Sequence, residues 1–253
     1  MDLGLNGLRV LVTGGTKGIG LHCARIFAEE GAAVSVCARD ATGVTETVEQ
    51  LKTKGVPVFG RAVDVSNAHA LKSWVQDSAA ALGGIDMVVG NVSALAVADD
   101  EAAWKSGFET DMMHSVRLVN AAMPWLEKSS AASITLISSV SGREVDFTGP
   151  AYGAFKAALV HYAQGLAMKL APMGIRANTV SPGNTYFEGG IWQSIEQNNP
   201  DLFKGALAMN PMGRMARPEE IARGVVFLAS PASSFTSGTN LVIDGALTKG
   251  VQL

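Results

Sequence analysis

The sequence predicts a single α/β domain, residues 1–253, built on a doubly wound parallel sheet with helices on both faces. Short apolar runs alternate with longer segments whose apolar residues recur at helical spacing. Several of the short runs are apolar without alternation, which is typical of strands covered on both faces. Hydrophobic residues make up 47% of the 253 residues, and no Pro/Ser-rich linker divides them, so one large core is expected.

Each element can be placed in order along the chain. The expected strands are Leu8–Val12, Ala33–Cys37, Val56–Ala62, Asp86–Val89, Ser133–Ser138, Ile175–Val180 and Asn240–Ile243. The expected helices are Gly18–Glu30, Val44–Lys54, Ala68–Leu82, Ala102–Met123, Tyr152–Ala171 and Pro218–Ala229. The least regular stretch, Gly183–Met215, mixes aromatic and methionine residues with polar ones, and we interpret 184–215 as a substrate lid. A small helical excursion packed on the body is the alternative.

Composition excludes several classes of function. The net charge is −3 with no basic block, so no nucleic-acid partner is expected. The N-terminal segment has no charged leader before a long apolar run, and no membrane span is found, so a cytoplasmic protein is expected. Cys23 and Cys37 lie in apolar stretches and are interpreted as buried thiols, with no metal site and no disulfide framework.

A glycine-rich loop follows the first expected strand and opens the first expected helix. Glycine allows a sharp turn there, and the backbone N–H groups of a helix N-terminus attract a pyrophosphate. The spacing Gly-x-x-x-Gly-x-Gly differs from the common dinucleotide fingerprint, and a plain turn is the alternative. The residues expected to contact a dinucleotide are Gly14, Thr16, Lys17, Gly18, Ile19 and Gly20.

The end of the second expected strand indicates which dinucleotide fits. An NAD site carries an acid about 20 residues after the loop, on the ribose 2′-hydroxyl. Here Ala38-Arg39 stands at the strand end, and a guanidinium binds a 2′-phosphate through two parallel hydrogen bonds. Lys17 adds a second positive charge, although either cation alone is also compatible with an ordinary surface residue. Asp40 lies one residue beyond the place of a ribose acid, so NADP(H) is the expected cofactor.

Three residues in order indicate acid–base chemistry. Tyr152 and Lys156 stand four apart in an expected helix, so they share one face. A cation beside a phenol stabilises the phenolate and makes proton transfer easier near neutral pH. Ser139 ends the preceding expected strand, thirteen residues upstream of Tyr152, at the sheet edge where ligands bind.

Together these motifs resemble the short-chain dehydrogenase/reductase family over essentially the whole chain. The matching residues are Thr13–Gly20, Asp64, Asn91, Ile137-Ser138-Ser139, Tyr152, Lys156, Asn178, Pro182-Gly183 and Asp244-Gly245. The resemblance implies a Rossmann-type sheet of seven strands. It also implies that Tyr152 is the general acid in reduction, that Ser139 steadies the substrate oxygen, and that Lys156 binds the nicotinamide ribose and tunes Tyr152.

The same resemblance implies further cofactor contacts and an assembly. Asp64 and the backbone of Val65 would meet the adenine, and Asn91 would line the ribose. Pro182 and Gly183 would pack against the nicotinamide. Thr185 stands near the place of a threonine that binds the carboxamide. Family members are commonly tetramers, so a homotetramer with interfaces on helix faces and on the C-terminal strand is expected.

Two departures from the family pattern stand out. The usual Asn-Asn-Ala-Gly after the fourth strand reads Gly90-Asn91-Val92-Ser93. The fourth catalytic residue of the family, an asparagine that holds a water beside the lysine, falls at Asp111. An ionised carboxylate only accepts hydrogen bonds, so Asp111 would hold that water or pair with Lys156. The alternatives are a shifted register or a residue that only caps a helical kink.

The expected function is NADP(H)-dependent reduction of a hydrophobic ketone, or oxidation of the matching secondary alcohol. The pocket candidates are mostly apolar, although core packing of the same side chains is the alternative: Val92, Leu95, Ser141, Val145, Tyr186, Phe187 and Trp192. A 3-oxoacyl-acyl-carrier-protein reductase is a second hypothesis, weakened by Ser130 and Met173 at the two places where such enzymes dock the carrier with arginines. A non-catalytic NADP(H)-binding protein is the rival from another class.

Overall fold

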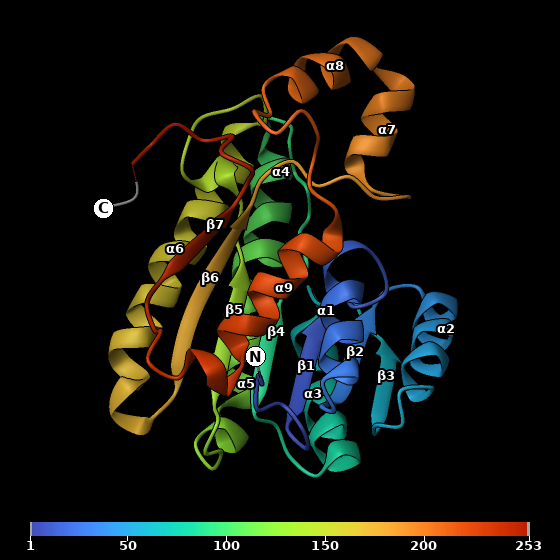
Figure 1. The fold of residues 1–253 in the computed structure, drawn as a ribbon, viewed down its shortest axis with the longest axis vertical. Helices are drawn as coiled ribbons and strands as arrows, with labels where there is room; N and C mark the ends of the chain where they lie inside the picture. The colour runs from blue at the N-terminus through green and yellow to red at the C-terminus, as the bar shows by residue number, and fades with distance from the viewer. Residues whose placement is uncertain (1, 252–253) are drawn as a thin grey trace.

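A computed structural model describes residues 2–251 and shows one parallel sheet sandwiched between helices (Figure 1). The sheet has seven strands in the order β3-β2-β1-β4-β5-β6-β7, and every pairing is parallel. The strands are β1 (Arg9–Thr13), β2 (Ala33–Ala38), β3 (Val58–Ala62), β4 (Met87–Gly90), β5 (Ser133–Ile137), β6 (Arg176–Pro182) and β7 (Asn240–Ile243). The predicted fold class is therefore confirmed.

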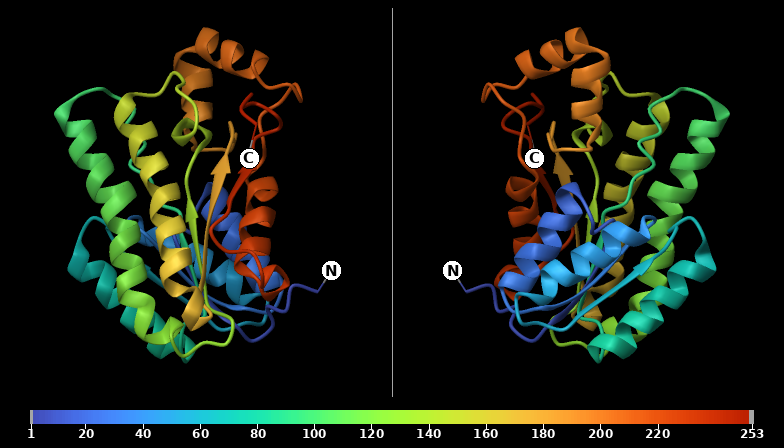
Figure 2. Two further views of the ribbon diagram at one scale, coloured as in Figure 1. Left: turned by 90° about the vertical axis from the view of Figure 1, so that its left-hand side faces the viewer. Right: turned by 90° about the vertical axis from the view of Figure 1, so that its right-hand side faces the viewer.

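The helices cover the two faces of the sheet, as the two side views show (Figure 2). The larger helices are α1 (Gly18–Glu29), α2 (Ala41–Lys52), α3 (Ala68–Leu82), α5 (His114–Leu126), α6 (Pro150–Leu170) and α9 (Pro218–Ala229). Helices α3, α5 and α6 bury Trp74, Leu118 and Leu159 in one core. Helices α1 and α9 bury Phe27 and Val225 in a second core on the opposite face. Each face therefore packs against its own set of apolar residues.

The strand order places the candidate site. From β1 the chain runs outward to β3 and then returns to β4 on the other side of β1. Such a reversal leaves a crevice at the carboxyl ends of the strands, where ligands bind in open α/β sheets. The glycine loop, Arg39, Asn91, Ser139 and Gly183 each follow a strand end, so the topology brings them to this one edge.

The structure corrects one predicted helix. The stretch expected as a single helix over Ala102–Met123 is α4 (Glu101–Gly107), the π-helical segment η1 (Phe108–Met113) and then α5. A π-helical turn holds an extra residue, and the apolar spacing on either side of it does not reveal the insertion. The segment lies over the sheet and carries Asp111.

Smaller differences follow from proline chemistry. Helix α6 begins at Pro150, two residues before the expected start, because proline is well suited to the first helical position. Strand β3 begins at Val58 and not at Val56, because Pro57 has no N–H for the ladder. Cys23 and Cys37 are both buried and free, as predicted, and burial raises the pKa of each thiol.

The predicted lid segment begins after β6 ends and folds into two helices above the rest of the molecule (Figure 1). These are α7 (Ile191–Asn198) and α8 (Pro200–Ala208). Trp192, Ala206 and Met215 form a small core of their own inside it. The segment is thus a helical excursion rather than an open loop. Across residues 2–251, no helix has the length and apolar character needed to cross a membrane.

Candidate active site

A tight turn brings Ser139 to the start of α6. The short 3-10 turn η2 (Val140–Gly142) follows β5, and a Cβ placed on Gly142 would lie 2.7 Å from the backbone of Ala157. A Cβ on Gly153 would lie 2.7 Å from the Ser141 carbonyl oxygen. Only glycines allow this close packing, so the turn is held against the helix. Ser139 is 8% exposed there.

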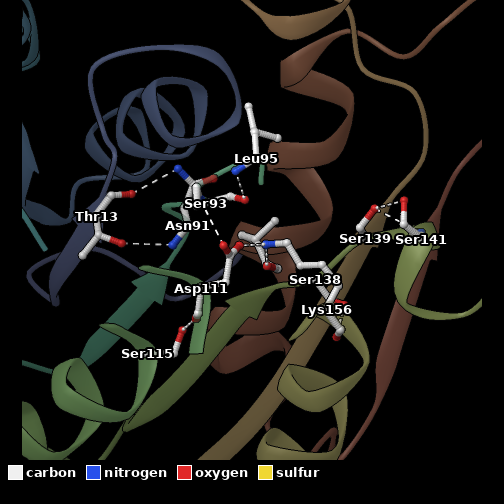
Figure 3. Close-up of polar contacts among 12 residues, drawn as sticks. Thr13, Asn91, Ser93, Leu95, Asp111, Ser115, Ser138, Ser139, Ser141 and Lys156 are labelled. Atoms are coloured by element: carbon white, nitrogen blue, oxygen red, sulfur yellow. Dashed lines mark hydrogen bonds and ion pairs between the residues drawn. The ribbon is translucent and has the colours of Figure 1, made fainter. Parts of the chain in front are cut away.

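Lys156 is buried and points its ammonium toward the end of β5 (Figure 3). Nζ donates to the Ile137 carbonyl oxygen at 3.1 Å and lies 5.6 Å from the centre of the Tyr152 ring. Burial is the largest influence on the pKa of Lys156 and by itself lowers it. The negative charges of Asp111 and of the Tyr152 phenolate outweigh burial and raise the pKa above its ordinary value. The ammonium is therefore held in its charged form.

Asp111 is the partner of that ammonium. Its Oδ1 lies 3.1 Å from Lys156 Nζ, and both side chains are 2% exposed. Its Oδ2 accepts a hydrogen bond from the Ala94 N–H at 3.0 Å. The register that aligned Asp111 with the family's asparagine thus places it beside the lysine. The same carboxylate also fastens the loop that follows β4.

His114 is a buried residue of this site that sequence reasoning missed. It opens α5, three residues after Asp111, and its Nε2 lies 3.0 Å from Thr13 Oγ1. Burial lowers the pKa of His114 to about 4, against the opposing effect of the Asp111 charge. The spacing Asp-x-x-His, which puts both side chains on one helical face, was a signal that could have found it.

The glycine loop has the features of a phosphate cradle. Gly14 and Gly18 have φ of +64° and +52°, which favour glycine. A Cβ on Gly20 would lie 2.2 Å from the Gly14 carbonyl oxygen. No side chain caps helix α1, so its first backbone N–H groups can hydrogen-bond an anion such as a phosphate. The Asn91 side chain donates to the carbonyls of Thr13 and Gly14 at 3.1 and 3.2 Å, which ties β4 to the loop.

The charged residues at the end of β2 separate into two roles. Asp40 caps α2, accepting from the N–H groups of Thr42 and Gly43 at 3.1 Å each, so its carboxylate is used by the protein itself. Arg39 and Lys17 are exposed. Hydrogen bonds from Ser66 chiefly lower the pKa of Asp64, and the charge of Arg39 contributes, so Arg39 lies near the predicted adenine end.

The residues therefore fit a dinucleotide with a 2′-phosphate, because α1 has no side-chain cap at the end that would meet the pyrophosphate and two exposed cations stand where a ribose acid would lie. Thr16 and Ile19 are partly buried and Val65 is buried in the same region. Within the residues that the structure describes, no group of three or more His, Cys, Asp or Glu side chains is placed to hold a metal ion.

On the other side of the crevice, β6 ends at Pro182, and a Cβ on Gly183 would lie 2.8 Å from Asp244 Cα. Thr185 is buried, and its hydroxyl donates to the Gly183 carbonyl oxygen at 3.0 Å. Phe187 packs on the glycine loop. Its ring lies so close to Gly18 that a Cβ added there would be 2.6 Å from it. Its role as a pocket residue stays a prediction.

The other pocket candidates lie in different surroundings. Val92 packs against the core, whereas Leu95 is 44% exposed and has φ of +48°. Val145 is fully exposed to solvent, and its role as a pocket residue stays a prediction. Tyr186 and Trp192 pack with Phe203 inside segment 184–215, with ring centres 6.0 and 6.4 Å away. Of this set, Ser141 contacts Ser139 directly.

Comparison with known proteins gives the same class. A family model described as enoyl-(acyl carrier protein) reductase matches residues 14–248. Isoepoxydon dehydrogenase patN of Penicillium expansum is 41% identical over 257 residues, covering 100% of this chain and 99% of that protein. The chain belongs to the short-chain dehydrogenase/reductase family of oxidoreductases.

Two solved structures are similar along nearly the whole chain. L-sorbose reductase from Gluconobacter frateurii, complexed with NADPH and L-sorbose, has a TM-score of 0.91 and 29% identity, covering 99% of this chain and 100% of that one. An NADPH-bound short-chain oxidoreductase from Pseudomonas aeruginosa PAO1, described as containing an atypical catalytic centre, has a TM-score of 0.90 and 27% identity, covering 96% and 98%.

Proposed function

We propose that this protein is an NADP(H)-dependent oxidoreductase that interconverts a small hydrophobic ketone and its secondary alcohol. The observation that carries the proposal is the meeting of three groups at one sheet edge. Ser139 is held by a glycine turn against the first turn of α6, and Tyr152 and Lys156 share that helix. The named activities of the relatives, isoepoxydon dehydrogenase and L-sorbose reductase, belong to the same reaction class.

The chain's own residues would act on the substrate oxygen. When bound, NADPH supplies the hydride that reduces the carbonyl carbon and leaves as NADP⁺. Tyr152 gives its phenolic proton to the oxygen, and Ser139 donates a hydrogen bond that stabilises the developing negative charge. Lys156 keeps a positive charge beside Tyr152, and Asp111 keeps Lys156 charged in its buried place. Solvent then restores the proton to Tyr152, so one proton is consumed for each ketone reduced.

The proposed preference for NADP(H) rests on Arg39 and Lys17. Both are exposed at the edge where the adenosine would lie, and Asp40 is already used as the cap of α2. A 2′-phosphate would gain two cations there and meet no free carboxylate. The two solved relatives carry NADPH, which supports the same choice.

A screen of aryl ketones, cyclic ketones and 3-oxoacyl thioesters with NADPH and NADH tests the proposal. We expect turnover of a simple ketone with NADPH, a loss of about 100-fold or more in kcat for Tyr152→Phe, and a loss of about tenfold in the NADPH/NADH preference for Arg39→Ala. Activity surviving Tyr152→Phe would contradict the mechanism.

The same screen separates the alternatives. Turnover confined to 3-oxoacyl thioesters would favour an acyl-carrier reductase. Binding of NADPH with no turnover of any carbonyl would favour a non-catalytic binding protein.

A further inference from the structure

A second serine lies beside Ser139. The hydroxyl oxygens of Ser139 and Ser141 are 3.2 Å apart, as Figure 3 shows. Ser141 Oγ in turn donates to Asp146 Oδ2 at 2.5 Å. The other oxygen of Asp146 accepts from the N–H and the hydroxyl of Thr148 at 2.9 and 2.6 Å. A chain of hydrogen bonds thus runs from Ser139 through Ser141 to a fixed carboxylate.

The direction of each hydrogen bond in this chain follows from the groups involved. A carboxylate only accepts hydrogen bonds, and a serine hydroxyl has a single hydrogen to donate. The hydrogen of Ser141 is therefore used on Asp146, and Ser139 is the donor in its contact with Ser141. Toward any other group in the pocket, Ser141 Oγ acts only as an acceptor.

Binding of a ketone would break this arrangement. In the proposed mechanism Ser139 turns its only hydrogen to the substrate oxygen, which leaves Ser141 Oγ without a donor. An acceptor left unpaired where a bound substrate excludes water is costly, so a substrate that brings its own donor is favoured. Because the two serine oxygens are only 3.2 Å apart, that donor must stand close to the reacting carbonyl.

We propose that Ser141, oriented by Asp146, binds a hydroxyl group on the carbon next to the reacting carbon. The substrate is then an α-hydroxy ketone, and its reduced form is a vicinal diol. This assignment of the substrate class rests on the proposed function, because it takes Ser139 as the group that binds the reacting oxygen.

The position of Ser141 is set by the backbone. Its carbonyl oxygen is pressed against Gly153, the residue after Tyr152, so the distance from Ser141 to the reacting groups is fixed by packing. The loop that carries Asp146 also contacts segment 184–215, because the rings of Phe147 and Trp192 meet edge to face with centres 5.3 Å apart.

The test compares 2-hydroxycyclohexanone with cyclohexanone, each with NADPH, on the same enzyme preparation. The kcat/KM of the hydroxy ketone is expected to exceed that of cyclohexanone by about tenfold, the factor that one hydrogen bond supplies. Ser141→Ala should bring the ratio close to one. Asp146→Ala, an exposed position, should reduce it as well, because the hydrogen of Ser141 is then no longer held away from the pocket.

The ratio cancels any inactive fraction, and Glu144→Gln is the matched control. Glu144 is in the same loop but accepts from the backbone of Lys249 and Gly250, so its substitution should keep the ratio. Equal kcat/KM for the two ketones in the wild type, or a preference that survives Ser141→Ala, overturns the subsite and leaves the proposed function standing. Failure of both ketones, and of the wider panel, to oxidise NADPH overturns the proposed function instead.

Discussion

At the scale of single residues, the carboxylate of Asp111 changes which groups set the pKa of Lys156. An asparagine at this place would leave the ammonium buried with no full negative charge other than a tyrosinate. Here Asp111 opposes burial and keeps the pKa of Lys156 above its ordinary value. The charged form of Lys156 therefore depends on a buried ion pair, and removing one partner of such a pair is strongly destabilising.

Substituting Asp111→Asn should keep activity but move its alkaline limit. Without the carboxylate, burial acts on Lys156 with less opposition, so the pKa of Lys156 falls. Activity that requires the ammonium is then lost at a lower pH as the pH rises. The measurement is kcat/KM across pH 6 to 11, with Glu109→Gln, whose carboxylate pairs with Arg117 and not with Lys156, as the control. An unchanged profile would show that the ion pair has no part in the reaction.

His114 makes a separate prediction about stability. Its pKa is about 4 in the folded protein, below the ordinary value of 6.5, so only the unfolded chain takes up this proton as the pH falls between them. Stability from the neutral histidine is complete above pH 6.5 and is lost toward pH 4, by about 2 kcal/mol between pH 7 and 5. Urea unfolding should show that this part of the pH dependence disappears in His114→Gln.

His161→Gln serves as the control for that measurement, because it removes a histidine from the exposed surface and not from the buried site. Equal pH dependence in the wild type and in His114→Gln would mean that folding does not shift the pKa of His114, which would contradict the prediction.

At the scale of elements, strands were easier to predict than helix interruptions. Continuous apolar runs such as Met87–Gly90 are typical of strands buried on both faces, and the glycine loop marks the first turn. The π-helical segment is different, because its extra residue is stabilised by tertiary packing around Asp111 and leaves no mark in local spacing. For the same reason, the sequence left the ion pair between Asp111 and Lys156 as one of several alternatives. Only the placement of η1 against α6 decided between them.

The hydrogen-bond partners of the candidate site were less predictable still. Ser139, Tyr152 and Lys156 follow from order and spacing, but the chain from Ser139 to Asp146 depends on how one loop folds back. The role of Asp40 also depends on local geometry, because its side chain caps α2 rather than facing the crevice.

The cap of α2 provides the prediction at this scale. Asp40→Ala should lower the free energy of unfolding by about 1 kcal/mol, because two N–H groups lose their acceptor. It should leave the kcat/KM ratio of NADPH to NADH unchanged, and Asp40→Ser should recover much of the stability. Urea titration and paired kinetics measure the two effects. A large change in cofactor preference would instead make Asp40 part of the ribose site.

At the scale of the whole molecule, the outer surface carries an aromatic cluster. Trp104 and Phe108 are 40% and 46% exposed, and both pack on Phe155, with ring centres 5.6 and 6.3 Å away. Exposed apolar clusters of this kind commonly mark surfaces that other chains cover. The cluster lies over α4, η1 and α6, next to the segment that holds Asp111.

We expect a homotetramer, with a mass near four times 26.3 kDa by light scattering. Phe108→Glu should lower the mass, because it places a charge in the aromatic cluster, whereas Val145→Glu at a fully exposed site should not. A wild-type protein that stays at the mass of one chain at all concentrations would contradict this expectation.

The small core of the lid has a consequence for how such an enzyme can diverge. Trp192, Ala206 and Met215 form a small core separate from the two cores that hold the sheet, and Trp192 also meets Phe147 of the loop before α6. Substitutions in this small core should therefore alter packing mainly within segment 184–215. The sheet and helices that position Ser139, Tyr152 and Lys156 can keep their structure while this segment changes. A lineage could in this way exchange one substrate for another by rebuilding some thirty residues, and a laboratory graft of this segment should be tolerated for the same reason.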